Sequence, residues 1–284
     1  METIDTKTGI LTINLAELGR NWRRLKSRMN FADCGASIKA DAYGLGGDKA
    51  IVKLCKMGCK EFFVALIDEG ISLRKALQRK SLDANIHVLG GPMNISETLV
   101  EYNLIPVLNS LQDIQYWKKK HPQALADVHI DTGMSRLGLS PNDVQLLRTE
   151  SEKIKGLNIC FVMSHLACSE DANAEMNTKQ LRSFRDALSI FPNCKASLAN
   201  SSGIFLGDKY HFDLARPGAS LYGVNPTPGK FNPMSGVIRL QGKILQVREI
   251  NAPQTVGYGA TFQAKKKLRL ATVGVGYADG YLRS

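Results

Sequence analysis

The sequence Ala36-Ser37-Ile38-Lys39-Ala40-Asp41-Ala42-Tyr43-Gly44-Leu45-Gly46 is an apolar run that ends in one lysine and then breaks into small residues and glycines. This pattern predicts a short buried strand over Gly35–Lys39, followed by a turn that lets a ligand approach closely. Apolar surroundings disfavour the charged form of a lysine, which makes its amine a usable nucleophile or base towards carbonyl compounds. Taken alone, the stretch also fits a surface lysine at a strand end.

Outward from this stretch, short apolar runs alternate with helical patterns. The predicted strands are Gly35–Lys39, Glu61–Leu66, Ile86–Leu89, Ile105–Leu108, Val128–Asp131, Leu157–Ser164, Lys195–Leu198 and Ala219–Tyr222. The predicted helices are Leu15–Met29, Asp48–Met57, Glu69–Arg79, Leu111–His121, Pro141–Lys153 and Asn177–Leu188. Such alternation predicts an α/β fold, an eight-stranded β/α barrel of the TIM type. An open doubly wound sheet is the alternative, but no glycine-rich dinucleotide turn follows the first strand.

The pattern changes after Tyr222. A linker rich in proline and glycine, residues 223–229, precedes two further strand patterns, Gly236–Ile250 and Lys267–Val275, with no helical pattern between them. We therefore expect a partial all-β domain after the barrel. The predicted domains are residues 11–228 for the barrel and 229–284, together with 1–10, for the incomplete β domain.

The composition indicates an ordinary soluble globular protein, because 44% of the residues are hydrophobic and 22% are charged. The net charge is +11, but the basic runs 118–120 and 265–267 are short and far apart, without interleaved aromatic residues. This argues against a nucleic-acid partner and leaves an anionic ligand, such as a phosphorylated cofactor, as the partner that the charge favours.

Neither a metal site nor a membrane segment is expected. The cysteines lack the two-residue spacing of zinc or redox motifs, and His165 with Cys168 has no second pair. Scattered thiols suit a reducing compartment, the polar start of the chain does not resemble a signal peptide, and the longest apolar runs are too short to span a bilayer. We expect a cytoplasmic location.

Chemically suggestive groups stand near five of the predicted strands. These groups are Lys39 with Tyr43, Asp131–Arg136, Ser164-His165, Asn200–Gly203 and Arg216–Ala219, the last entering the eighth strand. Barrel active sites form at the carboxyl ends of strands, and small hydroxyl residues and glycines there can hold a phosphate. Each group alone also fits a capped turn, a salt bridge or a core histidine, but five together predict a site. Pyridoxal phosphate is one carbonyl cofactor that lysines hold in this way.

The same residues resemble the successive motifs of bacterial alanine racemases, in that family's order and over essentially the whole chain. The motifs are Ile38–Gly44, His129–Gly138, Met163–Ala167, Ala199–Ser202, Arg216–Gly223, Val256–Phe262 and Gly276–Gly280. The resemblance implies a pyridoxal 5′-phosphate-dependent racemase of small amino acids. It also implies a homodimer whose active sites are shared across the subunit interface.

The resemblance further implies the roles of individual residues. Lys39 would bind the cofactor covalently and serve as one catalytic base, and Tyr258, from the partner subunit, would be the other. A chain of Tyr258, His165 and Arg216 would stabilise the phenolate, and Arg216 would face the pyridine nitrogen of the cofactor. Arg136 would contact the ring hydroxyl and the substrate carboxylate, and Tyr277 would line the entrance. The residues implied for the phosphate are Tyr43, Asn200, Ser201, Gly218 and Ala219.

Two features depart from the family pattern. His129 stands where many members have a lysine that becomes carbamylated and steadies the neighbouring arginine, so Arg136 must be oriented in another way. The sequence also stops at Ser284, where members continue with a Met-Asp pair and a late tyrosine, so we expect a C-terminally shortened member. It could be a fragment, a decayed gene or a natural short form.

Three functions follow from this reading. The first is an alanine racemase that supplies D-alanine for peptidoglycan. The second is a racemase of another amino acid, such as serine or lysine. The third is a non-catalytic remnant that still binds pyridoxal phosphate.

Overall fold

The structure is a computed structural model that describes residues 7–282. The chain divides into two compact units: Asn14–Val237 forms one, and the terminal segments, up to Ile13 and from Ile238 onward, form the other. The predicted boundary, between residues 228 and 229, lies earlier in the chain than this division. Within residues 7–282, no helix has both the length and the apolar composition that crossing a membrane requires.

The larger unit is a barrel of parallel strands, which confirms the predicted fold class. Its strands are β2 Asp33–Cys34, β3 Ala36–Ser37, β4 Glu61–Val64, β5 Asn85–Val88, β6 Ile105–Leu108, β7 Leu125–His129, β8 Asn158–Met163, β9 Lys195–Ser197 and β10 Leu214–Ala215. They lie in the order β2-β10-β9-β8-β7-β6-β5-β4-β3. Most of these segments are apolar and buried, as expected for parallel strands that are covered on both faces.

The two short strands β2 and β3 together make the first strand of the barrel. They are separated only by Gly35, and they pair with β10 on one side and with β4 on the other. Backbone bonds continue both ladders, from Gly35 N–H to Ala215 C=O (2.9 Å) and from Ile38 N–H to Phe63 C=O (2.9 Å). This segment therefore joins the two ends of the sheet.

The prediction of the eighth strand at Ala219–Tyr222 is wrong. That segment is a 3-10 turn, η4, and the eighth strand is β10. Pro217 lacks an N–H for the ladder, and Gly218 (φ −128°, ψ −87°) turns the chain out of the strand. Arg216 consequently follows the eighth strand instead of entering it. The apolar run is buried because η4 packs beside α1 (Leu15–Lys26), not because it belongs to the sheet.

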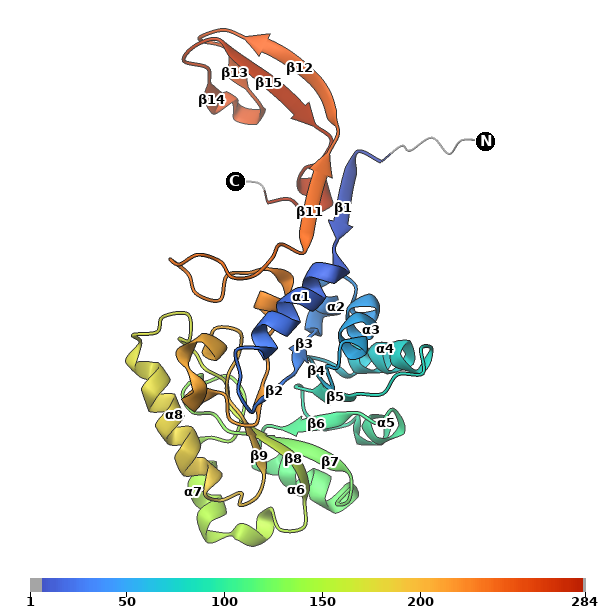
Figure 1. The fold of residues 1–284 in the computed structure, drawn as a ribbon, viewed down its shortest axis with the longest axis vertical. Coiled ribbons are helices and arrows are strands. Elements are labelled where there is room, and N and C mark those ends of the chain that lie inside the picture. Colours follow the sequence, from blue (N-terminus) through green and yellow to red (C-terminus); the bar gives the residue numbers. More distant parts are fainter. Residues whose placement is uncertain (1–6, 283–284) are drawn as a thin grey trace. The chain divides into compact units, whose positions relative to one another are not determined.

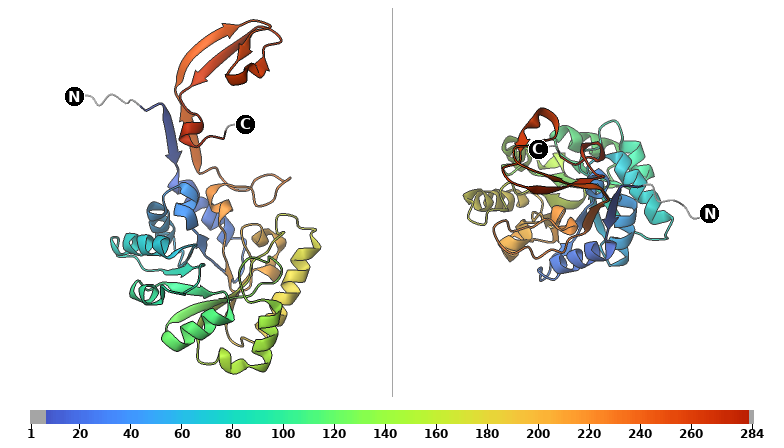
Figure 2. Two further views of the ribbon diagram at one scale, coloured as in Figure 1. Left: turned by 180° about the vertical axis from the view of Figure 1, so that it is seen from behind. Right: turned by 90° about the horizontal axis from the view of Figure 1, so that it is seen from above.

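The helices lie on the outside of the barrel (Figures 1 and 2). Besides α1 they are α3 Gly47–Lys56, α4 Ile67–Gln78, α5 Ser96–Glu101, α6 Leu111–Lys120, α7 Pro141–Thr149 and α8 Glu175–Leu188. Capping residues fix several starts: the side chain of Asn14 accepts bonds at the start of α1, and Ser140 does so before α7. The helix predicted over Pro141–Lys153 ends at Thr149, and a separate 3-10 turn, η1 (Ser151–Lys153), follows. Sequence analysis missed α5.

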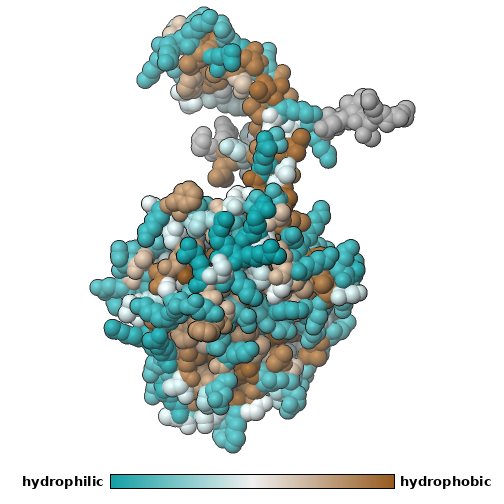
Figure 3. All heavy atoms as spheres, in the orientation of Figure 1, coloured by the Kyte–Doolittle hydropathy of each residue, from teal (hydrophilic) through white to brown (hydrophobic). Residues whose placement is uncertain are grey.

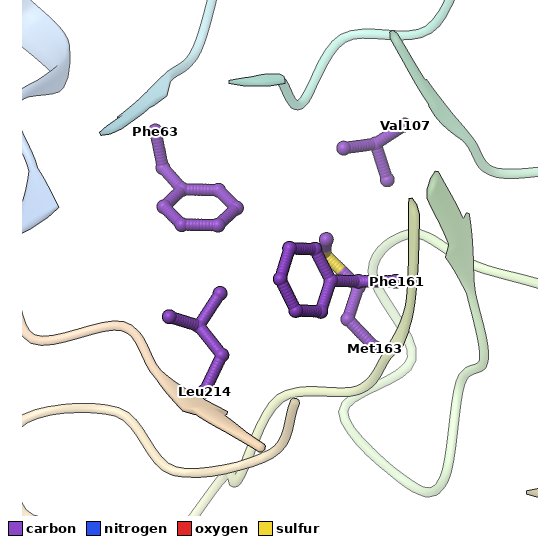
Figure 4. Packing of buried hydrophobic residues seen from close by; sticks show 5 residues of the cluster. All are labelled: Phe63, Val107, Phe161, Met163 and Leu214. Atoms are coloured by element: carbon purple, nitrogen blue, oxygen red, sulfur yellow. The ribbon is translucent and has the colours of Figure 1, made fainter. Parts of the chain in front are cut away.

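Large apolar side chains from different strands meet in the barrel interior (Figure 4). The cluster consists of Phe63, Val107, Phe161, Met163 and Leu214.

A charged network lies beside this cluster. His87 stacks on Phe63 with ring centroids 4.5 Å apart and is fully buried. Its ring nitrogens pair with Asp127 (Nδ1 to Oδ2, 2.6 Å) and Glu61 (Nε2 to Oε2, 2.8 Å). A buried charge needs such partners, so this triad is a point at which the stability of the barrel depends on pH.

The smaller unit consists of antiparallel strand pairs. They are β1 Gly9–Ile13 with β11 Ile238–Gly242, β12 Ile244–Ile250 with β15 Leu268–Val273, and β13 Thr255–Val256 with β14 Phe262–Gln263. This confirms the predicted all-β character. Many apolar side chains of this unit are exposed, and Figure 3 shows apolar residues at its surface. They include Leu240, Ile244, Leu245, Val247 and Phe262.

Candidate active site

A cavity of about 220 Å³ lies in the barrel unit, next to the carboxyl ends of the strands. It brings together all nine site residues that the sequence predicts within this unit. They are Lys39, Tyr43, Arg136, His165, Asn200, Ser201, Arg216, Gly218 and Ala219. These residues come from positions up to 180 apart in the chain, and the topology of parallel strands is what gathers them.

Lys39 does not end a strand, as the sequence suggested, because the strand stops at Ser37 and Lys39 begins α2 (Lys39–Gly44). The next four residues, Ala40 to Tyr43, all have left-handed backbone angles, with φ between 50° and 60°. Such angles cost an L-residue roughly 1–2 kcal/mol each. The turn places the half-buried Lys39 and the ring of Tyr43 on the same cavity.

Arg216 is buried, and none of its bonds to described residues is to a carboxylate. Its guanidinium donates to the Ser197 hydroxyl and to Ser164 C=O (2.6 Å), and it lies 5.8 Å from the centre of the Phe63 ring. Burial lowers the pKa of Arg216 to about 10, an effect that the charge of Asp127 opposes. The guanidinium therefore remains a cation at neutral pH, with a fixed orientation.

His165 is held as a neutral ring. Burial, together with the charge of Arg216, lowers its pKa to about 3. The Nη2 atom of Arg216 lies 3.5 Å from Nδ1 of His165. Because a guanidinium can only donate, Nδ1 must be the acceptor, and the proton of the neutral ring is on Nε2.

His129 is neutral too, but in the other tautomer. Asn109 donates its amide N–H groups to Leu89 C=O (2.9 Å) and Val107 C=O (3.0 Å), so its oxygen faces Nδ1 of His129 at 2.9 Å. The Nδ1 atom must then carry the proton, which leaves Nε2 as an acceptor. Burial, with the charges of Arg216 and Arg136 adding to it, lowers the pKa of His129 to about 4.

The lining of the cavity also carries hydroxyl and backbone N–H groups. The Ser201 hydroxyl accepts from the N–H groups of Gly218 (3.0 Å) and Ser220 (3.3 Å). A Cβ atom on Gly218 would lie 2.3 Å from the Tyr43 hydroxyl, so only glycine leaves room there. Such a cradle fits a phosphate group, and with the Lys39 amine on the same cavity the residues fit pyridoxal phosphate.

Asn200 supports this cradle instead of presenting a free amide to it. Its oxygen accepts from the Ser169 hydroxyl (2.8 Å) and from Gly203 N–H (2.9 Å), and its nitrogen donates to Leu166 C=O (3.3 Å). The amide therefore shapes the loop after β9, on which Ser201 stands.

The remaining predicted residues, Tyr258 and Tyr277, belong to the smaller unit and do not line this cavity. Both residues are exposed, at 85% and 70% of their reference surface areas. Their roles stay predictions. Within residues 7–282, no group of three or more histidine, cysteine, aspartate or glutamate residues is arranged to hold a metal ion.

Sequence reasoning missed several residues around the cavity. Ser37, Phe63 and Met163 line it, and each stands at or near the end of a barrel strand. The alternation of strand residues between the interior and exterior of the barrel could have found them. Asn109, which bonds to His129 without lining the cavity, left no comparable signal.

Two family models match the sequence. The model described as "Alanine racemase, N-terminal domain" covers residues 13–226, and "Alanine racemase, C-terminal domain" covers residues 237–284. The chain belongs to the alanine racemase family. Its members are isomerases that use pyridoxal phosphate, so the family explains why a lysine and a phosphate cradle share one cavity.

Individual alanine racemases resemble the chain over nearly its whole length. The alanine racemase of Rhodospirillum rubrum is 46% identical, over 99% of this chain and 76% of that protein. The catabolic alanine racemase of Mesorhizobium japonicum is 44% identical, over 96% of this chain and 72% of that protein. The crystal structure of the Bartonella henselae alanine racemase, with covalently bound pyridoxal phosphate, has a TM-score of 0.88 and 39% identity, covering 98% of this chain and 78% of that one.

Proposed function

We propose that this protein is an alanine racemase that interconverts L- and D-alanine with pyridoxal 5′-phosphate bound to Lys39. The observation that carries the proposal is the cavity, which combines the Lys39 amine, the buried Arg216 cation and a phosphate cradle. In this family the product D-alanine serves peptidoglycan synthesis, and we propose the same use here.

When bound, pyridoxal phosphate withdraws electrons from the α-carbon of an attached amino acid and so acidifies its α-proton. The protein must then remove that proton from one face and deliver a proton to the other. We propose Lys39 as the group that moves the proton on one face. The turn that begins at Lys39 fixes where its amine enters the cavity.

Arg216 is proposed to face the pyridine nitrogen. A guanidinium that is charged at neutral pH can donate a hydrogen bond but does not readily release its proton. Arg216 would therefore leave the nitrogen it faces unprotonated and keep the electron withdrawal moderate. We expect this to favour return of the proton to the α-carbon over transamination or decarboxylation.

Tyr258 is proposed as the second base, supplied by the partner subunit. A phenol is a poor base unless its anion is stabilised. The neutral His165 can provide this, because Arg216 occupies its Nδ1 and leaves Nε2–H as a donor. The tautomer of His165 therefore supports the predicted chain of Tyr258, His165 and Arg216.

Arg136 and Tyr277 are proposed to contact the substrate. The Arg136 guanidinium lines the cavity and has no hydrogen bond or ion pair with any described residue, so it is available to an amino-acid carboxylate. His129, with its acceptor Nε2, is the neighbour that we propose to orient Arg136 in place of a carbamylated lysine.

We further propose a homodimer in the cytoplasm. Exposed apolar side chains on the smaller unit, such as Leu245, Val247 and Phe262, support association with a second copy. We propose that cofactor binding belongs to the predicted barrel domain, residues 11–228. The residues proposed to contact the phosphate are those predicted from the sequence: Tyr43, Asn200, Ser201, Gly218 and Ala219.

The test is the formation of D-alanine from L-alanine by the purified chain with added pyridoxal phosphate, followed by circular dichroism. We expect conversion in both directions by the parent and none by Lys39→Ala. Conversion of serine or lysine in preference to alanine would contradict the substrate assignment. Cofactor binding without any racemisation would instead identify a non-catalytic remnant.

A further inference from the structure

Glu69, in the first turn of α4, bonds to two different loops at the carboxyl ends of the barrel strands. Its Oε2 atom accepts from the N–H groups of Ala65 (2.7 Å) and Leu66 (3.0 Å), which caps α4. Its Oε1 atom accepts from the N–H of Ala40, in the loop after β3. One carboxylate therefore joins the loop that follows β3 to the loop that follows β4.

The loop that Glu69 reaches is the left-handed turn, Ala40–Tyr43. The two cofactor residues of the proposed function, Lys39 and Tyr43, lie directly before the turn and at its end. The handedness of the turn therefore sets the separation between the amine and the phenol hydroxyl. Alanine at a φ of 50° is unfavourable, so Ala40 needs an external contact to stay in this conformation.

Other bonds also hold the turn: across its start, Ala42 N–H donates to Ile38 C=O (2.9 Å). The Asp41 carboxylate accepts from Gly47 N–H (2.7 Å), and the Asp41 C=O accepts from Leu45 N–H (2.9 Å). Among the described residues, the N–H of the exposed Ala40 itself has a single hydrogen-bond partner, the Glu69 carboxylate.

We propose that Glu69 is a positioning residue for the cofactor site: it holds the left-handed turn that sets Lys39 against Tyr43. This inference rests on the proposed function only in that Lys39 and Tyr43 hold the cofactor. Glu69 itself does not line the cavity and takes no part in proton transfer.

The chemistry of the contact requires a carboxylate. Both oxygens of Glu69 act as acceptors, one towards each loop. A glutamine has one oxygen and one NH₂ group, so it can cap α4 but must then point a donor at the N–H of Ala40. Glu69→Gln therefore removes the link to the turn while it keeps the volume and the helix cap.

The first experiment titrates the cofactor-free full chain with pyridoxal phosphate and follows the visible absorbance of the lysine-bound cofactor. We expect Glu69→Gln to raise the dissociation constant about tenfold. Glu97→Gln is the matched control, because Glu97 lies in the first turn of α5 and contacts Ser96 and Lys120, neither of which lines the cavity. Equal affinities of Glu69→Gln and the parent would overturn the proposal.

A second substitution separates the turn from the helix cap. In Glu69→Gln, the further change Ala40→Gly should recover about fivefold of the lost affinity, because glycine adopts positive φ at little cost. A weakened cap of α4 would not respond to a glycine in another loop. Affinity that stays low in the double variant would overturn the proposal.

Hydrogen exchange of the parent chain without cofactor tests the contact independently of the proposed function. We expect the amides of Ala40, Ala65 and Leu66 to be protected in the parent, and that of Ala40 to lose its protection selectively in Glu69→Gln. If the amide of Ala40 exchanged fast in the parent while those of Ala65 and Leu66 exchanged slowly, the bond between Ala40 and Glu69 would be refuted. A failure of cofactor binding in the parent, with the protection intact, would instead refute the proposed function alone.

Discussion

The buried His87 makes a definite prediction about the pH dependence of stability. Burial alone would lower the pKa of His87, but the charge and bond of Asp127, together with Glu61, raise it from 6.5 to about 9. Both ring nitrogens donate, at 2.6 and 2.8 Å, so the network is complete only when the imidazole is protonated.

The raised pKa of His87 determines whether stability rises or falls with pH. A folded-state pKa above the unfolded value means that the native state binds the proton more tightly. The stabilisation by protonated His87 is fully present below about pH 6.5 and is lost as the pH rises through about 9. At 1.36 kcal/mol for each pKa unit, it amounts to about 3 kcal/mol of the free energy of unfolding.

Urea unfolding followed by tryptophan fluorescence measures this contribution. Both tryptophans, Trp22 and Trp117, are buried in the barrel unit, so their emission reports on the barrel. Between about pH 6 and about pH 10 we expect the parent to lose about 3 kcal/mol and His87→Gln to lose far less. His211→Gln is the control, because the carboxylate beside it, Asp208, is exposed. Equal pH dependence of His87→Gln and the parent would refute the reasoning.

Two further predictions concern the cavity. Gly218→Ala places a methyl group on the Tyr43 hydroxyl and should weaken binding of pyridoxal phosphate about tenfold or more in an absorbance titration; unchanged affinity would show that the cradle is not where the phosphate binds. Asn109→Leu removes the acceptor that fixes the tautomer of His129, so nitrogen NMR should show a proton on Nδ1 in the parent and a mixture of tautomers in the variant. A proton on Nε2 in the parent would contradict the assignment.

The sequence predicted the barrel because its strands are short apolar runs with helical patterns between them, and burial on both faces makes such runs visible. It failed at the eighth strand. Leu214–Ala215 is too short to leave a periodic signal, whereas Ala219–Tyr222 is apolar and buried for another reason, its packing beside α1. A short apolar run predicts that a segment is buried, but it does not distinguish a strand from a 3-10 turn.

The candidate residues of the barrel were predictable because functional groups gather at strand ends. The backbone conformation and the histidine tautomers of these residues could not be predicted. The left-handed path of the turn after Lys39 has no sequence signal, since alanine and tyrosine avoid positive φ. It depends on the bonds of Asp41 and, as we propose, on the bond to the distant Glu69. The opposite tautomers of His129 and His165 likewise depend on Asn109 and Arg216, which are distant in sequence.

The central claim is that an amine and a phenol exchange the α-proton on opposite faces of the substrate. Its most direct test is the loss of the α-deuteron from L- and D-alanine, measured separately for the parent, Lys39→Ala, Tyr258→Phe and the control Tyr281→Phe, whose tyrosine is also exposed in the smaller unit. We expect Lys39→Ala to exchange neither enantiomer, and Tyr258→Phe to slow exchange of L-alanine about 100-fold or more while largely keeping that of D-alanine. If Tyr258→Phe exchanged both enantiomers at equal rates, whether fast or slow, the account would be contradicted.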